Sequence, residues 1–110
     1  MAGTRIPKDI RDFVARVLPS VEHLETFIVL RRNTTRSWSA ADLSVELRIP
    51  EAAAGNVLEQ LASDNFLDVK ISSEILYRFD PATAELDALS NRCTDFYLRE
   101  RIAMMRTLGI

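Results

Sequence analysis

Apolar side chains recur at intervals of three and four along the first third of the chain, which is the spacing of one face of an amphipathic helix. A first helix is predicted to begin at Pro7 and to end at Pro19, because proline is tolerated in the first turn of a helix but not in its interior. Ser20 is a favourable N-cap for a second helix that runs to about Arg32. A polar loop is predicted over residues 33–37.

Two further helices follow, separated by a tight turn. Ser39 is predicted to cap the shorter one, and Asp42 reaches back to it as in a capping box. This helix stops before Ile49-Pro50, since the residue before a proline avoids the helical conformation. The next helix begins at Glu51 and ends shortly before Asn65, because asparagine is the commonest substitute for glycine in a left-handed helix cap.

The hydrophobic period then changes from helical spacing to strict alternation. In residues 67–71 Leu67, Val69 and Ile71 alternate with Asp68 and Lys70. In residues 75–79 Ile75, Tyr77 and Phe79 alternate with Leu76 and Arg78, and Ser72-Ser73-Glu74 forms a turn between the two segments, which predicts a β-hairpin. A lone hairpin is marginal in water, so this one must pack against the helices. From about Thr83 the helical pattern returns, and a shift of its apolar stripe indicates a bend near Arg99-Glu100 or a second contact surface.

Five segments carry a family resemblance: Trp38-Ser39-Ala40-Ala41-Asp42-Leu43-Ser44, Leu47-Arg48-Ile49-Pro50, Val57-Leu58-Glu59-Gln60-Leu61, Phe66-Leu67 and Tyr77-Arg78-Phe79. With the order of elements, they resemble the winged helix-turn-helix of small bacterial transcriptional regulators of the MarR, ArsR and PadR type. The implied fold class is mostly α with a small β-hairpin, with an N-terminal helix and a long C-terminal helix added.

A chain of 110 residues has room for one domain and one core. Residues 1–110 are therefore assigned to a single winged-helix domain. Its three-helix core covers about residues 20–65, the hairpin at about 67–79 is its wing, and one or more C-terminal helices cover about 83–108.

The resemblance implies binding to duplex DNA, with the second helix of the motif in the major groove and the wing against the adjacent backbone or minor groove. Asn56 and Gln60 would then be able to read adenine, although for Asn56 the interpretation as a solvated helix residue is favoured. The helix that begins at Glu51 departs from the family pattern. It has no Arg or Lys with which to contact guanine, and Glu51 and Glu59 would face a groove lined with phosphates.

The charge is unevenly distributed around a formal net value of −2. Residues 1–36 hold seven basic and four acidic side chains, whereas residues 37–68 hold one basic and six acidic ones. A nucleic-acid surface needs an excess of positive potential, so the acidic middle of the chain opposes DNA binding. Weak, salt-sensitive phosphate contacts are expected at most for a monomer. The candidate side chains are Arg31, Arg32, Arg36, Arg48, Lys70 and Arg78.

The last segment carries more apolar surface than one small core is expected to cover, which favours an association surface. The candidate residues of a homodimer interface are Phe96, Tyr97, Ile102, Met105 and Leu108. Such a dimer would pair two recognition helices for two half-sites. The alternative is that these residues fold back onto the first helix and complete the core of the monomer.

No catalytic, metal or cofactor site is expected. One Cys and one His are too few for a closed zinc site, and neither a glycine-rich phosphate loop nor a nucleophile paired with a base is present. Cys93 falls on an apolar stripe, where a free thiol acts as a small hydrophobe. The sequence lacks a membrane-spanning apolar run and a secretion signal at its start, so we expect a cytoplasmic protein without a membrane partner.

Two functional hypotheses follow from the sequence. The family resemblance favours a DNA-binding transcriptional regulator that holds DNA through arginine-bearing loops and the wing. The charge distribution favours a winged-helix module that contacts another protein instead of DNA.

Overall fold

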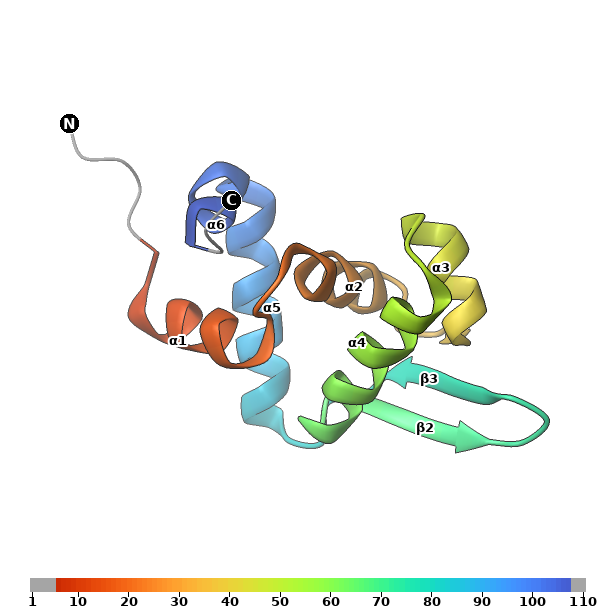
Figure 1. The fold of residues 1–110 in the computed structure, drawn as a ribbon. Coiled ribbons are helices and arrows are strands. Elements are labelled where there is room, and N and C mark those ends of the chain that lie inside the picture. The colour runs from red at the N-terminus through yellow and green to blue at the C-terminus, as the bar shows by residue number, and fades with distance from the viewer. Residues whose placement is uncertain (1–5, 108–110) are drawn as a thin grey trace.

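The computed structural model describes residues 6–107, apart from the side chains of residues 104, 105 and 107. The chain forms six helices and three strands within that range (Figure 1). In chain order these are α1 (Lys8–Val17), α2 (Val21–Arg32), β1 (Ser37–Trp38), α3 (Ala40–Leu47), α4 (Glu51–Ser63), β2 (Leu67–Ile71), β3 (Ile75–Phe79), α5 (Ala84–Arg99) and α6 (Arg101–Thr107).

The predicted starts of α2 and α3 are confirmed by the side chains that cap them. Ser20 accepts a hydrogen bond from the backbone N–H of His23 at 3.2 Å, at the start of α2. Ser39 and Asp42 form the predicted capping box, with N···O distances of 3.0 and 3.2 Å. These bonds satisfy backbone donors that a helix leaves without partners in its first turn.

Two residues adopt the left-handed conformation at helix ends. Asn65 has φ 68°, as the sequence predicts for the residue that ends α4. Arg48 has φ 56° in the turn between α3 and α4, a conformation that arginine does not favour and that the sequence pattern therefore does not predict. The turn is closed by Ser44, whose hydroxyl donates to the carbonyl oxygen of Ile49 at 2.5 Å. This bond fixes the direction in which α4 leaves α3.

The prediction of a polar loop over residues 33–37 is wrong at its end, because Ser37 and Trp38 form strand β1. β1 pairs antiparallel with β3, so the sheet has three strands in the order β1-β3-β2. Trp38 is buried. Pairing with β3 satisfies backbone groups that burial of this side chain would otherwise remove from water.

The hairpin β2–β3, called the wing below, is buried only at its inner end. Its register places Leu67 opposite Phe79, Val69 opposite Tyr77 and Ile71 opposite Ile75, so all six side chains share one face. The inner side chains are buried, but Val69, Ile71 and Ile75 are 41%, 78% and 44% exposed. The expectation that the wing packs on the helices therefore holds for its base and fails for its tip.

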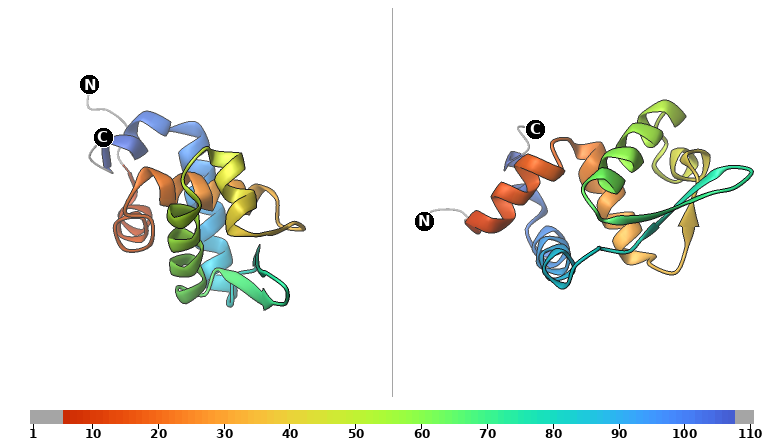
Figure 2. Two further views of the ribbon diagram at one scale, coloured as in Figure 1. Left: turned by 45° about the vertical axis from the view of Figure 1, so that its right-hand side comes forward. Right: turned by 90° about the horizontal axis from the view of Figure 1, so that it is seen from below.

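The helices separate into two groups (Figure 2), with α1, α5 and α6 at one end of the molecule and α3, α4 and the wing at the other. α2 contacts both groups. The predicted bend is present at Glu100, where α5 ends and α6 begins. Within the described part of the chain, none of the helices combines the length and the apolar character needed to cross a membrane.

We predict that Gly55→Ala stabilises the fold. Gly55 lies inside α4 where it faces α3, and an added Cβ would meet the Cβ of Ala40 at 3.8 Å, an ordinary van der Waals distance. Alanine is favoured over glycine in a helix interior by about 0.5–1 kcal/mol. Urea unfolding should show a higher midpoint with an unchanged slope. A lower midpoint would mean that α3 and α4 cannot accept even one methyl group.

Candidate nucleic-acid interface

Helix α4 follows α3 after a short turn, and one of its sides is exposed. Its buried side packs Ala54, Val57, Leu58 and Leu61 into the core, and α3 lies across it. The exposed side chains of α4 are Glu51, Ala52, Asn56, Glu59, Gln60 and Ser63. This surface carries two carboxylates and no cation, so the bidentate arginine contact to guanine cannot be made from it.

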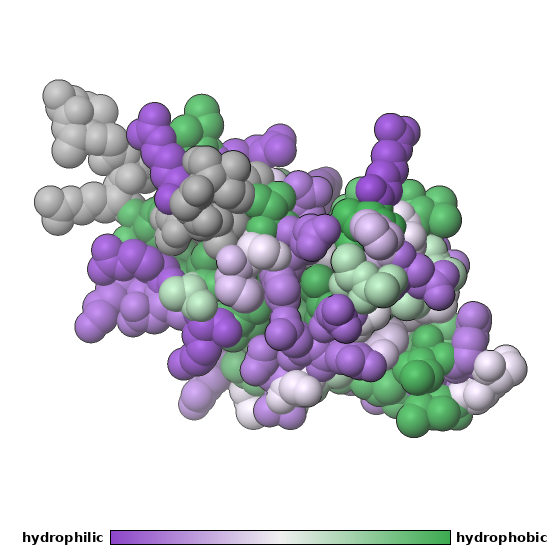
Figure 3. Space-filling view, in the orientation of Figure 1, coloured by the Kyte–Doolittle hydropathy of each residue, from purple (hydrophilic) through white to green (hydrophobic). Residues whose placement is uncertain are grey.

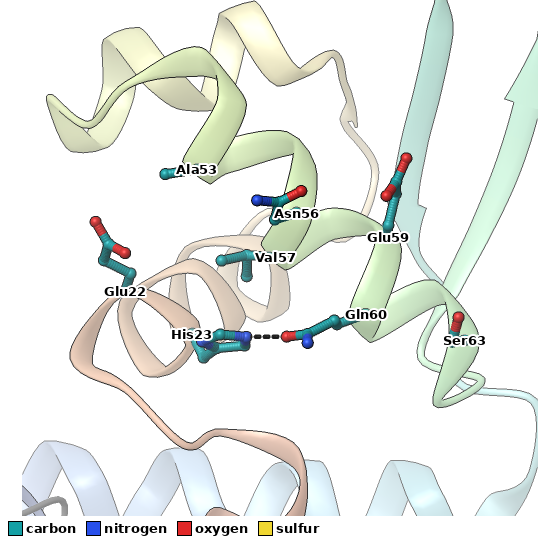
Figure 4. A pocket seen from close by; sticks show the side chains of 8 residues that line it. All are labelled: Glu22, His23, Ala53, Asn56, Val57, Glu59, Gln60 and Ser63. Atoms are coloured by element: carbon teal, nitrogen blue, oxygen red, sulfur yellow. Dashed lines mark hydrogen bonds between the residues drawn. The ribbon is translucent and has the colours of Figure 1, made fainter.

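A groove of about 570 Å³ separates α4 from α2 (Figure 4). Its lining residues are Glu22, His23, Ala53, Asn56, Val57, Glu59, Gln60 and Ser63. Gln60, one of the two predicted adenine readers, is hydrogen-bonded through its Oε1 to Nε2 of His23. Asn56 extends into the same groove and Glu59 points away from it (Figure 4). The candidate base-reading amides therefore lie beside α2.

His23 links the start of α2 to α4. Its Nδ1 lies 2.6 Å from the hydroxyl oxygen of Ser20, and its Nε2 meets Gln60. Since the Gln60 oxygen only accepts, Nε2 is the donor, and the Ser20 hydroxyl donates to Nδ1 in the neutral ring. Half of this arrangement has a signal in the sequence, namely the three-residue spacing of Ser20 and His23. The contact with Gln60 spans 37 residues and no local pattern predicts it.

Glu59 brings its negative charge to the junction between α4 and the wing. Burial raises the pKa of the Tyr77 phenol above its ordinary value of 10.0, and the charge of Glu59 raises that pKa further. Tyr77 belongs to β3, so the carboxylate acts on the base of the wing. A phosphate placed between α4 and the wing would meet this same charge.

Two of the six candidate phosphate contacts are engaged within the chain. Arg31 is half-buried, donates to the side-chain oxygen of Asn91 in α5, and has its guanidinium carbon 5.9 Å from the centre of the Phe79 ring. Arg78 forms ion pairs with Asp68 at 3.8 Å and with Asp80 at 3.7 Å. The partner of Arg31 is 60 residues away in sequence, so spacing gave no signal for it.

The other four candidates are exposed and form no ion pair among the described residues. Arg48 precedes α4, and Lys70 lies on β2. Arg36 precedes β1, with its guanidinium carbon 3.7 Å from the centre of the Trp38 ring. This cation–π contact holds the head group in place while its charge stays accessible. Arg32, at the end of α2, is the fourth.

The predicted dimer surface needs correction at two of its five residues. Phe96 and Tyr97 are 5% and 6% exposed and belong to the core of the chain itself, so the core covers more apolar surface than the sequence indicated. Ile102 is 72% exposed and stays a candidate, and Leu98 is exposed as well. The side chain of Met105 is not described, and Leu108 lies outside the described residues.

The His, Cys, Asp and Glu side chains in the described part of the chain do not meet the requirements of a metal site. No cluster of three or more His, Cys, Asp and Glu side chains there is arranged to hold a metal ion. Cys93 is buried, as its place on the apolar stripe predicts, and burial raises the pKa of its thiol from 9.0 to about 12. This thiol is neutral over the physiological range.

No protein-family model matches the chain, and no curated protein matches it. Among solved structures, HlyU from Vibrio cholerae N16961 has a similar fold, with a TM-score of 0.61 and 16% identity over 84% of this chain and 99% of that one. Reduced HlyU from the same organism gives 0.58 and 17% over 80% and 88%. The chain has a winged-helix fold. The predicted fold class is thus confirmed, while a likeness at this identity does not decide among the MarR, ArsR and PadR groups.

We predict that Arg31→Ala lowers the stability of the fold and that Arg32→Ala, its neighbour, does not. The first change removes the stem packed near Phe79 and leaves the Asn91 amide without its partner, a loss of about 1–2 kcal/mol. Arg32 is exposed, where substitutions change stability by less than about 0.5 kcal/mol. Urea unfolding of both variants makes the comparison, and equal losses would contradict the structural role of Arg31.

We predict a loss of stability above pH 9 that depends on Cys93. The unfolded thiol ionises near its ordinary pKa of 9.0, whereas the folded thiol keeps its proton until about pH 12. The unfolded state therefore binds fewer protons as the pH rises, and the unfolding free energy falls by about 1.4 kcal/mol by pH 10.

The control for this prediction is Cys93→Ala. It retains Tyr77, whose raised pKa also lowers stability at alkaline pH, so the difference between the two pH profiles isolates the thiol. Unfolding free energies from pH 7 to pH 10 provide the measurement. Parallel profiles for the two proteins would show that the folded thiol ionises as readily as the unfolded one.

Proposed function

We propose that this protein is a DNA-binding regulator that holds the backbone of duplex DNA through cations placed around α4, rather than reading bases with α4 itself. The observation that carries the proposal is that Arg36, Arg48 and Lys70 are exposed and free of ion pairs among the described residues. They come from the segments before β1, before α4 and within the wing, the parts of a winged helix that flank the nucleic acid.

The chemistry of these three side chains sets the kind of binding to expect. When one of these side chains binds a phosphate, it displaces a condensed counterion into solution. The affinity for DNA therefore depends on salt concentration and little on base sequence. The carboxylates of Glu51 and Glu59 oppose entry of α4 into the major groove. Weak binding without strong base preference is the expected result for a single copy.

The proposal predicts binding to a mixed-sequence duplex, followed by fluorescence anisotropy from about 50 mM salt upward. The logarithm of the affinity should fall linearly with the logarithm of salt concentration. The double variant Arg36→Gln, Arg48→Asn should flatten this slope by about 2, one unit for each lost phosphate contact. Asparagine is chosen at position 48 because it tolerates the left-handed conformation found there.

The matched control removes two arginines from α1, at the end of the molecule away from the wing (Figure 1). Arg11→Gln with Arg16→Gln makes the same change in net charge and should leave the slope unchanged. A slope flattened equally by both double variants would indicate a response to overall charge. No binding at about 50 mM salt would reject the proposal, because phosphate contacts are strongest there.

A second candidate function is a winged-helix module that contacts another protein. It is favoured by the surface of α4, which presents Glu51 and Glu59 without a cation, together with the apolar side chains exposed at the wing tip. Protein interfaces accept such surfaces, whereas a polyanion does not. If the anisotropy experiment shows no binding to DNA, contact with another protein is the function to test next.

A further inference from the structure

The wing ends in an open edge strand. β2 is the outer strand of the sheet, and of the described residues only those of β3 pair with it. An open edge presents backbone N–H and C=O groups that can pair with another strand. On β2 four of the five side chains, Asp68 to Ile71, are exposed as well.

The order of side chains on β2 reads Leu67-Asp68-Val69-Lys70-Ile71, with an acid and a base placed symmetrically around the central valine. If two such strands pair antiparallel with Val69 opposite itself, Asp68 of one lies opposite Lys70 of the other, twice. The same register places Leu67 opposite Ile71, also twice. Alternation along the strand keeps the charged pairs on one face and the apolar pairs on the other.

We propose that the partner of this edge is a second copy of the same chain, paired strand to strand through β2 in the register centred on Val69. The interface is isologous, because the two-fold axis relates each contact to its own copy. It joins the two sheets into one sheet of six strands, ordered β1-β3-β2-β2-β3-β1. The inference goes beyond the proposed DNA binding and does not require it.

Charge complementarity argues for a second copy over an unrelated strand. A lysine on an edge strand normally discourages pairing, because the partner must accommodate the charge. Here the strand supplies the compensating carboxylate itself, two residues before Lys70, and does so in a single register. Asp68 also pairs with Arg78 of its own wing at 3.8 Å, so Lys70 of the second copy would complete a row of alternating charges.

The exposed apolar tip supports the same arrangement. Val69, Ile71 and Ile75 form the outer part of the wing's apolar face. Figure 3 shows hydrophobic surface in the region of the wing, at the lower right. Antiparallel pairing brings the tip of each wing beside the base of the other, where Leu67 enters the core. Each tip then gains apolar neighbours that its own chain does not provide. The exposed residues Leu98 and Ile102 form no comparable self-complementary pattern.

Charge reversal tests the proposed register without DNA. The wild-type protein should show a mean mass that rises with concentration from 12.5 kDa towards twice that value in sedimentation equilibrium. Lys70→Asp alone and Asp68→Lys alone each turn both symmetric pairs repulsive, and each should raise the dissociation constant about tenfold. The double variant Asp68→Lys, Lys70→Asp exchanges the charges and should restore association.

Mixing provides the decisive measurement. The first single variant carries two acids at positions 68 and 70 and the second carries two bases, so an equimolar mixture should associate more tightly than either variant alone. Glu74→Lys is the matched control for Asp68→Lys, since it changes the net charge equally but lies in the turn, outside the paired strand. It should associate like the wild type.

Three results would overturn the proposal. The first is a wild-type protein that stays monomeric up to about 1 mM, a concentration at which weak contacts of this size associate. The second is that the single variants associate as well as the wild type. The third is that the mixture of the two single variants associates no more tightly than either variant alone. The second result would point to another surface, such as Leu98 and Ile102. Arg36 and Arg48, which test the DNA proposal, are unchanged in these variants, so the two proposals can fail separately.

Discussion

Four phenylalanine rings hold the elements of this fold together. Phe27 of α2 lies at the centre, with its ring 5.6 Å from that of Phe13 in α1, 5.6 Å from Phe66 between α4 and β2, and 5.6 Å from Phe79 in β3. All three contacts are edge-to-face, the arrangement in which the positive edge of one ring meets the negative face of another. Phe66 connects this cluster to both α4 and the base of the wing, because it lies between the end of α4 at Ser63 and the start of β2 at Leu67.

Local chemistry explains why the helix boundaries could be predicted from the sequence. Ser20, Ser39 and Pro50 act within one turn of chain, and Asn65 acts through its own backbone, so a short window holds the whole cause. Strand β1 was missed for the opposite reason. Its two residues become a strand only by pairing with Arg78 and Tyr77, some forty positions further along. No periodicity can reveal an element of two residues.

The candidate interface could be predicted only in part, because charge and exposure depend on partners distant in sequence. In the sequence Arg31 and Arg78 cannot be told apart from Arg36 as free cations. In the structure Arg31 is hydrogen-bonded to Asn91, and Arg78 forms ion pairs with Asp68 and Asp80. Gln60 is similarly engaged by His23. The acidic surface of α4 was predicted correctly, since exposed helix positions follow from the positions of buried ones.

Lys70 connects the two surfaces proposed for this molecule. As an exposed cation on the wing it can approach a phosphate, and in the paired register it faces Asp68 of a second copy. One ammonium group cannot fully satisfy both anions, so pairing through β2 takes Lys70 from the DNA-binding set and leaves the arginines at positions 36 and 48 in each copy. Pairing also doubles the number of those arginines on one assembly. If both proposals hold, affinity for DNA and self-association are linked through this residue, and by reciprocity each changes the other by the same factor.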